Sequence, residues 1–179
     1  MKSFDVIVIG LGHAGCEAAL ACARMGLETL GLTLRADRIA MMSCNPAIGG
    51  TAKGHLVREL DALGGEMAFA ADRAGTHFVT LNASKGPAVR ATRVLCDRDA
   101  YAAGMQETIR LQPRLTIHEG EAAELVTEGE RIVGVRLQDG TELGAKAVVV
   151  TTGTFLQALM HVGEEKSVGG RLGDAAATG

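Results

Sequence analysis

Aromatic residues are scarce in this chain. Its 179 residues include no tryptophan, one tyrosine and four phenylalanines. Proteins that bind single-stranded nucleic acid by stacking need exposed aromatic side chains, so this composition does not suit a stacking platform. A surplus of positive charge is also missing, since the formal net charge is -3 and the pI is about 6.0. The chain as a whole therefore does not attract polyanions, and any contact with nucleic acid requires a local cationic patch.

The sequence also lacks the cysteine and apolar patterns of several other protein classes. Its four cysteines (Cys16, Cys22, Cys44 and Cys96) form no CxxC pair and show no metal-ligand spacing. This favours reduced thiols and no metal site. No apolar run is long enough to cross a membrane. Asp5 interrupts the apolar start of the chain, and glycines follow where the cleavage site of a signal peptide would stand, so we expect a cytoplasmic protein.

What the sequence does contain is a pattern of alternating strands and helices rich in Ala, Val and Leu. Apolar residues make up 47% of the chain, which is enough to bury a core. The β-branched run at 4–9 predicts a buried strand, and the alanine-rich stretch at 14–25 predicts a helix that ends at Gly26. Residues 28–33 predict a second strand. Residues 4–33 therefore form one βαβ unit.

A glycine motif lies between the first strand and the helix. It consists of Gly10, Leu11, Gly12, His13, Ala14 and Gly15. This G-x-G-x-x-G pattern, placed after a strand and before a helix, is typical of dinucleotide binding. Gly10 permits the tight turn, Gly12 lets the backbone approach a pyrophosphate, and Gly15 lets helix and strand pack closely. The N-terminus of the helix presents N–H groups and a partial positive charge to the phosphates, and His13 is assigned to cofactor packing.

The end of the second strand lacks a feature of NAD-binding proteins. An acidic residue for the ribose hydroxyls is expected there, whereas the sequence has Thr33. Glu28 lies at the opposite end of the same strand. The ribose contact of Thr33 is therefore weaker or made differently, and simple NAD binding is disfavoured.

The rest of the chain divides into a loop-rich and a strand-rich part. Residues 34–54 predict a long functional loop, and residues 76–96 are expected to be irregular around Gly86 and Pro87. Helices are expected at 53–63, 65–74 and 97–111, and strands at 115–118, 122–127, 131–137, 141–144 and 147–151.

The strand-rich part predicts a β-meander at about 121–145, followed by a buried strand and a turn at 151–154 that contains Gly153. The crossovers of NAD dehydrogenases are mostly helical, whereas this arrangement resembles the FAD domains of two-dinucleotide flavoproteins. FAD is therefore the first choice and NAD the second. The predicted fold class is α/β: an incomplete, Rossmann-like FAD-binding domain with a parallel sheet, a helix layer and a β-meander crossover.

Two further segments are more specific than the glycine motif. Residues 42–50 are Met-Ser-Cys-Asn-Pro-Ala-Ile-Gly-Gly, and residues 82–93 are Asn-Ala-Ser-Lys-Gly-Pro-Ala-Val-Arg-Ala-Thr-Arg. With Gly-His-Ala-Gly at 12–15 and Gly-Gly-Arg-x-Gly-Asp at 169–174, they resemble the glucose-inhibited division protein A family. This family provides the FAD-binding subunit of the bacterial tRNA wobble-uridine modification complex. The resemblance covers residues 1–179, as the N-terminal part of the FAD-binding domain.

The resemblance implies an enzyme with FAD as prosthetic group, NADH as reductant and methylenetetrahydrofolate as one-carbon donor. It also implies a homodimer, a GTPase partner subunit, and tRNA as substrate, with a (carboxymethyl)aminomethyl-type group added at C5 of the wobble uridine. Flavin contacts of the family fall near Ala122 and Ala177, and some members have serine at the latter position. Gly153 completes the expected set of cofactor-binding residues.

Cys44 matches the cysteine in the Ser-Cys-Asn-Pro part of the family-type loop at 41–55, and the resemblance therefore implies a catalytic role. A thiolate can add to C6 of a uracil ring, which makes C5 nucleophilic. An inert buried cysteine is the alternative. Five cations near this loop and the second family segment either form the missing cationic patch or are solvated surface charges: Lys53, Arg58, Lys85, Arg90 and Arg93.

The chain departs from the family in length, because members run to several hundred residues. The NADH-binding insertion, the second half of the FAD domain and the helical region for tRNA and the GTPase are missing, so we expect a truncated product that is inactive alone. Two alternatives remain. One is a non-catalytic FAD-binding or dimerisation fragment. The other is a relative of the folate-dependent tRNA uridine methyltransferase, which would have an acidic residue in place of Thr33 and would lack the Asn-Pro-Ala-Ile-Gly-Gly loop.

Overall fold

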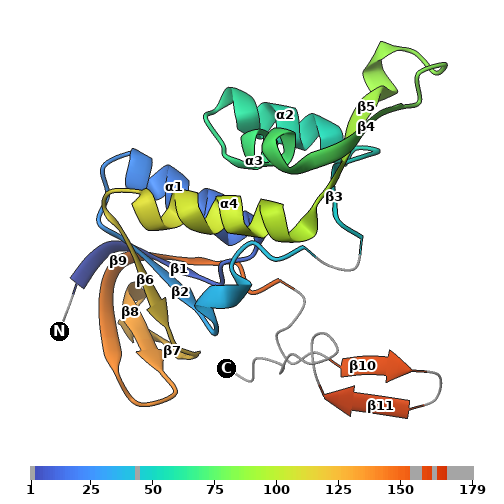
Figure 1. Cartoon of the computed structure of the whole chain (residues 1–179). Helices are drawn as coiled ribbons and strands as arrows, with labels where there is room; N and C mark the ends of the chain where they lie inside the picture. The colour runs from blue at the N-terminus through green and yellow to red at the C-terminus, as the bar shows by residue number, and fades with distance from the viewer. Residues whose placement is uncertain (1–2, 43–44, 154–158, 163–164, 169–179) are drawn as a thin grey trace. The chain divides into compact units, whose positions relative to one another are not determined.

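A computed structural model describes residues 3–42, 45–153, 159–162 and 165–168. The chain divides into two compact units (Figure 1). The first comprises Met1–Asp37 with Arg114–Gly179, and the second comprises Arg38–Pro113. Each unit is described by itself.

The first unit is built on a six-stranded sheet within the described residues, in the order β6-β2-β1-β9-β8-β7. The strands are β1 (Ser3–Ile9), β2 (Thr29–Thr33), β6 (Leu115–Glu119), β7 (Ala122–Glu128), β8 (Arg131–Leu137) and β9 (Glu142–Val150). β1 pairs in parallel with β2 and β9, and β2 pairs in parallel with β6. β7, β8 and β9 are antiparallel neighbours, which confirms the expected parallel sheet with a β-meander.

The core of this unit follows from the apolar strands and the small residues of the helix. Ile7 and Val8 in β1 have no exposed surface, and because successive residues of a strand face opposite sides, both faces of β1 are covered. The helix α1 (His13–Arg24) packs against β1, β2 and β6. Its buried residues recur at helical spacing and are mostly small, which allows close packing: Gly15, Cys16, Glu17, Ala19, Leu20 and Ala23.

The meander differs from the sequence expectation at one point. Residues 141–144 and 147–151 were expected to be separate strands, but they belong to the single strand β9. Gly144 is paired with both Ser3 of β1 and Gly134 of β8. A Cβ on Gly134 would collide with the carbonyl oxygen of Leu143, so glycine allows the close backbone approach that keeps β9 continuous.

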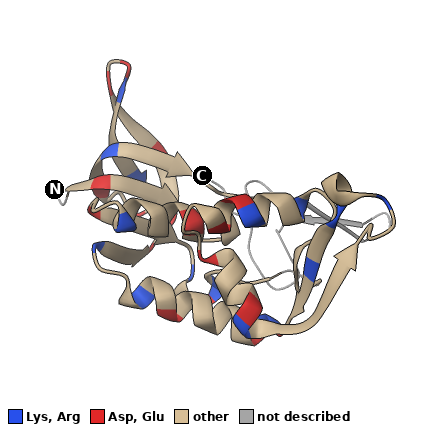
Figure 2. Ribbon diagram, turned by 90° about the horizontal axis from the view of Figure 1, so that it is seen from above, with Lys and Arg blue, Asp and Glu red and all other residues tan. Residues whose placement is uncertain are grey.

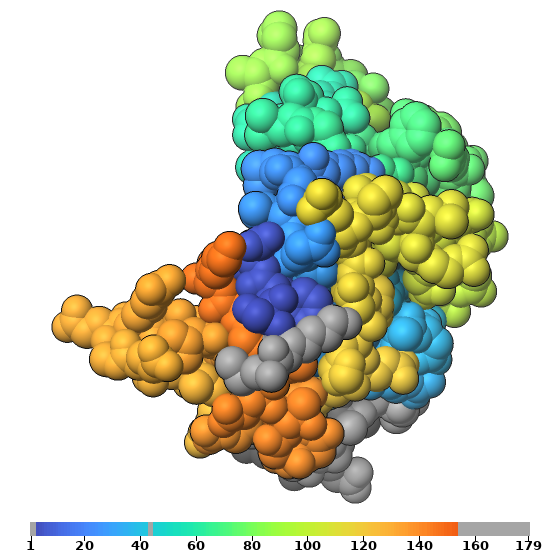
Figure 3. All heavy atoms as spheres, turned by 90° about the vertical axis from the view of Figure 1, so that its left-hand side faces the viewer, coloured from blue at the N-terminus to red at the C-terminus, as the bar shows by residue number. Residues whose placement is uncertain are grey.

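The far end of the meander is open to solvent. Figure 3 shows the turn between β7 and β8 projecting from this unit. Arg136 in β8 forms ion pairs with Glu124 in β7 and Glu142 in β9, which ties the three strands together on an exposed face. The hydrogen bonds that Arg136 donates to Glu142 and the charge of Glu124 raise the pKa of Arg136. Exposed pairs of this kind contribute no more than about 1 kcal/mol each.

The second unit combines three helices of the described residues with a small antiparallel sheet, in the order β3-β5-β4. The elements are β3 (Ala47–Gly49), α2 (Lys53–Ala62), α3 (Met67–Ala74), β4 (Gly75–Leu81), β5 (Ala91–Cys96) and α4 (Arg98–Leu111). The three helices lie close to where the sequence predicted them. Short 3-10 turns, η1 (Ala36–Arg38) and η2 (Pro87–Val89), complete the described elements of this region.

The expectation that residues 76–96 are irregular was wrong. They contain β4 and β5, which pair from Gly75↔Cys96 to Leu81↔Ala91. β4 is an edge strand that is mostly exposed on both faces, so it lacks the alternation of apolar and polar residues by which a half-buried strand is recognised. The predicted loop 34–54 likewise contains β3, which is only three residues long.

The C-terminal region contains one more described hairpin. β10 (Leu159–Val162) pairs in an antiparallel manner with β11 (Glu165–Val168). The sequence did not predict these strands. No helix in the described part of the chain is long and apolar enough to span a membrane.

Candidate dinucleotide site at the carboxyl edge of the parallel strands

The predicted cofactor residues of the first unit gather at one edge of its sheet. Because β1, β2, β6 and β9 run parallel, their carboxyl ends lie at the same edge. Backbone hydrogen bonds join the segments that follow them: Gly10 N donates to Leu32 O at 2.8 Å, and Gly120 N donates to Thr33 O at 2.8 Å. The edge beyond the carboxyl ends of parallel strands is where α/β sheets bind ligands.

The glycines of the motif have distinct steric roles. Gly10 has φ +89°, and a Cβ there would lie 2.6 Å from the carbonyl oxygen of Thr151. A Cβ on Gly15 would lie 1.8 Å from the carbonyl oxygen of Gly10. Both positions therefore exclude any side chain, as the motif predicted.

Thr151, which follows β9, braces this turn. Its hydroxyl donates to the carbonyl oxygens of Ile9 at 2.9 Å and Gly10 at 2.8 Å, and its backbone N–H donates to Ile9 O at 2.9 Å. The sequence placed Thr151 in the turn at 151–154 but indicated no bracing role for it, because its partners lie more than 140 positions away. Gly153 lies two residues further on, with φ +65°. The turn after β9 thus lies beside the glycine loop.

Gly12 is the open position of the motif. It is exposed, has φ -73°, and a Cβ built on it meets nothing within 4 Å. The protein itself therefore does not require glycine here for space or for backbone conformation. The motif requires it where a bound group must approach the backbone closely.

The N-terminus of α1, like those of α2 and α3, has no side-chain cap. Gly12 occupies the N-cap without a side-chain hydrogen bond, and the first turn contains no acidic residue. By contrast, Asp97 caps α4 by accepting hydrogen bonds from Asp99 N at 3.0 Å and Ala100 N at 2.9 Å. The N–H groups and dipole of α1 are thus available to an anion.

The other residues of the glycine motif line and support the turn. Leu11 is buried, and a Cβ on Gly31 would touch its methyl groups, so glycine in β2 makes room for it. Cys16 Sγ donates to Leu11 O at 3.4 Å. Burial lowers the pKa of His13, so its imidazole is neutral at neutral pH. A neutral, half-buried ring fits the packing role predicted for His13, and Ala14 is exposed next to it.

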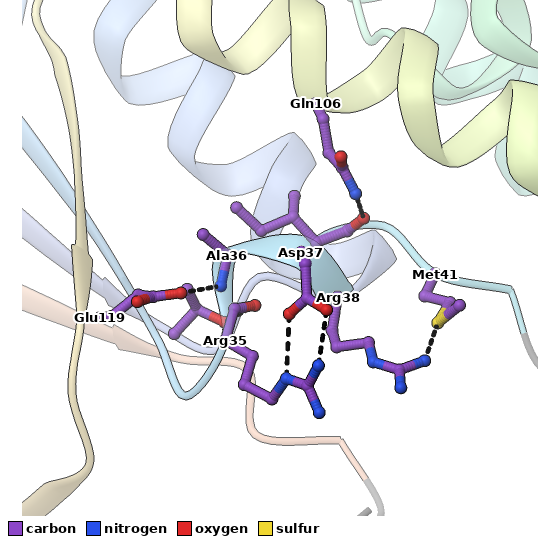
Figure 4. Close-up of polar contacts among 9 residues, drawn as sticks. Arg35, Ala36, Asp37, Arg38, Met41, Gln106 and Glu119 are labelled. Carbon is purple, nitrogen blue, oxygen red and sulfur yellow. Dashed lines mark hydrogen bonds and ion pairs between the residues drawn. The ribbon is translucent and has the colours of Figure 1, made fainter.

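Two carboxylates lie in or beside the segment after β2, and the sequence did not predict them at this edge. Thr33 Oγ1 donates to Arg35 O at 3.3 Å. Arg35 and Asp37 form a bidentate ion pair at 2.9 and 2.6 Å, and Glu119 Oε1 accepts from Ala36 N at 2.6 Å (Figure 4). Glu119 ends β6, the strand next to β2, so acidic groups do lie at this edge although Thr33 is neutral.

Ala122 belongs to the same region of the first unit. It begins β7, two residues after Gly120, and packs partly buried against the apolar core that contains Leu137. Ala177 was the remaining predicted flavin contact, and it lies outside the described residues. The structure thus places Gly10–Gly15, Thr33, Ala122 and Gly153 at the carboxyl edge of the strands.

The family-type loop 41–55 lies in the second unit. Arg38 Nη1 donates to Met41 Sδ at 3.0 Å, and Gln106 Nε2 donates to Ile39 O at 3.0 Å (Figure 4). These contacts fix the segment that leads to Cys44. Cys44 itself lies outside the described residues, so its predicted catalytic role stays a prediction.

The glycines after β3 show why this loop needs its particular sequence. Gly49 has φ +82°, and a Cβ there would collide with the carbonyl oxygen of Thr92. Gly50, with φ +105°, donates its N–H to the same oxygen at 2.9 Å. Gly54 is buried against Thr92 and Ala91 at the start of α2. The loop is thus locked onto β5 by its glycines.

The residues at the carboxyl edge fit the pyrophosphate of a dinucleotide. An uncapped helix N-terminus, an open Gly12 and a rigid turn at Gly10 provide N–H donors with room for phosphate oxygens. A sequence model of the family described as glucose inhibited division protein A matches residues 5–179. The chain belongs to this family.

Members of the family with high identity are tRNA modification enzymes by name. The tRNA uridine 5-carboxymethylaminomethyl modification enzyme MnmG of Myxococcus xanthus is 73% identical over 176 residues, and that of Syntrophotalea carbinolica is 54% identical over 178 residues. This chain aligns over 98% and 99% of its length, respectively, but spans only 29% of either relative. It corresponds to the N-terminal part of these enzymes.

Solved structures agree with this assignment. Aquifex aeolicus GidA matches 98% of this chain at 49% identity with a TM-score of 0.94, and the match spans 29% of that protein. The GidA-related protein of Thermus thermophilus matches at 22% identity with a TM-score of 0.66, which shows a shared fold alone. The fold is that of a two-dinucleotide-binding flavoprotein, as the sequence predicted.

Proposed function

We propose that this chain is the N-terminal part of an FAD-dependent enzyme that modifies C5 of the wobble uridine in tRNA. The uncapped N-terminus of α1 beneath the open Gly12 carries the cofactor half of this proposal. The 73% identity to the Myxococcus xanthus enzyme supports the tRNA half.

The N–H groups at the start of α1, around Gly12 and His13, would hold the pyrophosphate of FAD. In this proposal Thr33 and the carboxylate of Glu119 would lie on the ribose side, and Ala122, Gly153 and Ala177 would complete the cofactor contacts. When bound, a flavin supplies redox chemistry, that is, transfer of hydride or electrons. The residues of this chain would bind and orient it, and His13, whose pKa is lowered by burial, would pack beside the phosphates without adding charge.

Cys44 is the proposed nucleophile. Its thiolate would add to C6 of the uracil ring, so that electron density develops at C5, where the new substituent is attached. For comparison, burial raises the pKa of the Cys22 and Cys96 thiols, which suits structural rather than nucleophilic roles.

The remaining parts of the proposal concern the full-length enzyme. NADH and methylenetetrahydrofolate are the proposed co-substrates, and a GTPase subunit and a second copy of the flavoprotein are the proposed partners. We further propose that the enzyme acts in the cytoplasm, where its tRNA substrate is found. Because the chain spans 29% of its relatives, it is proposed to bind cofactor but to be inactive alone.

The cofactor proposal can be tested on the chain as it is. The visible spectrum is recorded with and without added FAD, and any released cofactor is identified by chromatography. Flavin absorption bands with FAD released would support the site. A folded, colourless protein that ignores FAD would contradict binding by this chain.

The catalytic proposal needs the remaining domains. A chimera is made in which this chain replaces the matching segment of the Myxococcus xanthus enzyme, and wobble-uridine modification is measured by mass spectrometry of tRNA nucleosides. We expect activity from the chimera and none from its Cys44→Ser variant, with FAD binding equal in both. A non-catalytic FAD-binding module is the second candidate, and an inactive chimera that retains FAD would support it.

A further inference from the structure

The β4–β5 hairpin of the second unit carries positive charge without negative charge. From Gly75 to Cys96 the chain has no aspartate or glutamate, but it has Lys85, Arg90 and Arg93. Figure 2 shows basic residues and no acidic ones along this hairpin. In a chain with net charge -3, such a stretch is a local reversal of the overall charge.

Two side chains of α2 form hydrogen bonds to the hairpin. His55 Nε2 donates to Ala88 O at 3.0 Å, and Arg58 Nη2 donates to Thr92 Oγ1 at 2.9 Å. These contacts hold the first half of α2 against β5 and the loop of the hairpin. We call the resulting set the cationic hairpin surface, and it comprises Lys53, Arg58, Lys85, Arg90 and Arg93.

The cations of this surface are not neutralised within the described structure. Four of them are exposed and Arg93 is half-buried, and none of the five forms an ion pair with a carboxylate of the described residues. Some cations elsewhere are paired with carboxylates, as in Arg114–Glu28 and Lys146–Asp5. Unpaired like charges that lie near one another repel, so an external polyanion would relieve this repulsion.

Lys53 is placed where its charge does not stabilise the fold. It is the first residue of α2, and the partial positive charge of a helix N-terminus disfavours a cation there. No acidic residue lies in the first turn of α2 to compensate. The charge of Lys53 therefore has no evident structural role.

The loop at the tip of the hairpin is held by its own hydrogen bonds. Asn82 Nδ2 donates to Val89 O at 3.1 Å, Arg90 Nε donates to Ala83 O at 3.0 Å, and Lys85 N donates to Asn82 O at 3.0 Å. A loop that is already ordered loses little conformational entropy on binding. Its cations are thus presented in a fixed arrangement.

We propose that the cationic hairpin surface binds the ribose-phosphate backbone of tRNA. This proposal rests on the proposed function, which supplies the polyanion. Backbone contacts by Lys and Arg are independent of base sequence, and each phosphate neutralised releases counterions, so the affinity depends steeply on salt. The surface would position the anticodon arm without reading its sequence.

The test removes two charges whose side chains make no contact that supports the fold. The double variant Lys53→Gln/Lys85→Gln is made in the chimera with the Myxococcus xanthus enzyme and in the 179-residue chain. Its control is Arg110→Gln/Arg131→Gln, which removes two exposed charges from α4 and β8. Binding of labelled tRNA is measured by fluorescence anisotropy from 0.1 to 1 M salt, with thermal unfolding as a check on folding.

We expect the surface variant to lower the slope of log affinity against log salt by about 1.4–1.8, at roughly 0.7–0.9 per lost phosphate contact. Over one decade of salt this corresponds to about 25- to 60-fold weaker binding at 0.1 M and little change at 1 M. The control should bind tRNA like the parent. Equal salt slopes for the surface variant and the parent would overturn the proposal. A competition experiment gives a second check: if polyglutamate displaces tRNA more readily than unrelated RNA does, the surface does not bind a ribose-phosphate backbone and the proposal fails.

The outcomes separate this proposal from the proposed function. A parent chimera that modifies tRNA, with a surface variant of unchanged salt slope, would overturn the surface alone. A parent chimera that retains FAD but neither binds nor modifies tRNA would overturn both. If the salt slope falls as expected while the parent chimera fails to modify uridine, the surface stands and the catalytic proposal fails.

Discussion

Gly12 and Gly15 lie three residues apart in one motif, yet the structure predicts opposite consequences for replacing them by alanine. A Cβ on Gly15 would lie 1.8 Å from the carbonyl oxygen of Gly10 and 2.7 Å from Thr151 Oγ1. A Cβ on Gly12 would meet nothing within 4 Å, and φ of -73° suits any residue. Gly15→Ala therefore lowers the stability of the fold, whereas Gly12→Ala mainly weakens the binding of the cofactor.

The magnitudes follow from these contacts. For Gly15→Ala the helix must move away from a backbone oxygen that cannot rotate aside, and we expect a loss of about 3 kcal/mol of unfolding free energy, the upper end for overpacking. For Gly12→Ala the loss is below about 1 kcal/mol, because alanine is only a poorer N-cap. In FAD binding, Gly12→Ala should lose about one charge-assisted hydrogen bond to the pyrophosphate, or about 1.5–3 kcal/mol, which is roughly 10- to 150-fold in Kd.

Two assays measure these quantities separately. Urea unfolding of the cofactor-free proteins gives the stabilities, and titration of flavin fluorescence gives Kd for FAD. The reasoning fails if Gly12→Ala folds normally and binds FAD as tightly as the parent. It also fails if Gly15→Ala is as stable as the parent, because the close approach of α1 to the glycine turn would then be wrong.

Three further predictions concern stability. Gly104→Ala in α4 should raise the unfolding free energy by about 0.5–1 kcal/mol in urea unfolding, because a Cβ there meets nothing within 4 Å and alanine favours the helix; an unchanged or lower value would contradict this. Asp97→Ala should lower it by about 0.5–2 kcal/mol through loss of the cap on Asp99 and Ala100, whereas Asp97→Asn should retain most of it. Because burial lowers the pKa of His13, the unfolded chain binds a proton at higher pH than the folded chain, so Tm should fall as pH decreases from the ordinary value of 6.5 toward the folded pKa; a parallel decline in His13→Gln would refute this assignment.

The βαβ unit was predictable from sequence because each local signal agrees with the next. The β-branched run 4–9, the alanine-rich helix and the ending at Gly26 are recognisable without long-range contacts. Gly10 and Gly15 were assigned correctly for the same reason, since the motif fixes the sterics of its own turn. The α/β fold class and the meander followed from the spacing of strand and turn signals.

The missed features depend on partners that are distant in sequence or on strands that are poorly buried. Thr151 acquires its role only when β9 lies beside β1, which brings it within hydrogen-bond distance of Ile9 and Gly10. Glu119 supports the segment after β2 because β6 and β2 are neighbours, an order that the sequence does not show. The edge strand β4 was missed because exposure on both faces removes the alternation that identifies a strand.

The chain uses its two long helices in different ways, and this difference bears on the cofactor site. α4 begins with Asp97 as a cap, which satisfies its N–H groups internally and contributes about 1 kcal/mol to stability. α1 begins at Gly12 without a side-chain cap, and glycine at this position gives up a few tenths of a kcal/mol relative to a capping side chain. Close packing around Gly12 could have required a glycine there in place of a capping residue. The position is instead exposed to solvent, and a Cβ built on it meets no atom within 4 Å. The start of α1 therefore fits an external anion as its cap, and the stability of the chain should rise with FAD concentration by RT ln(1 + [FAD]/Kd).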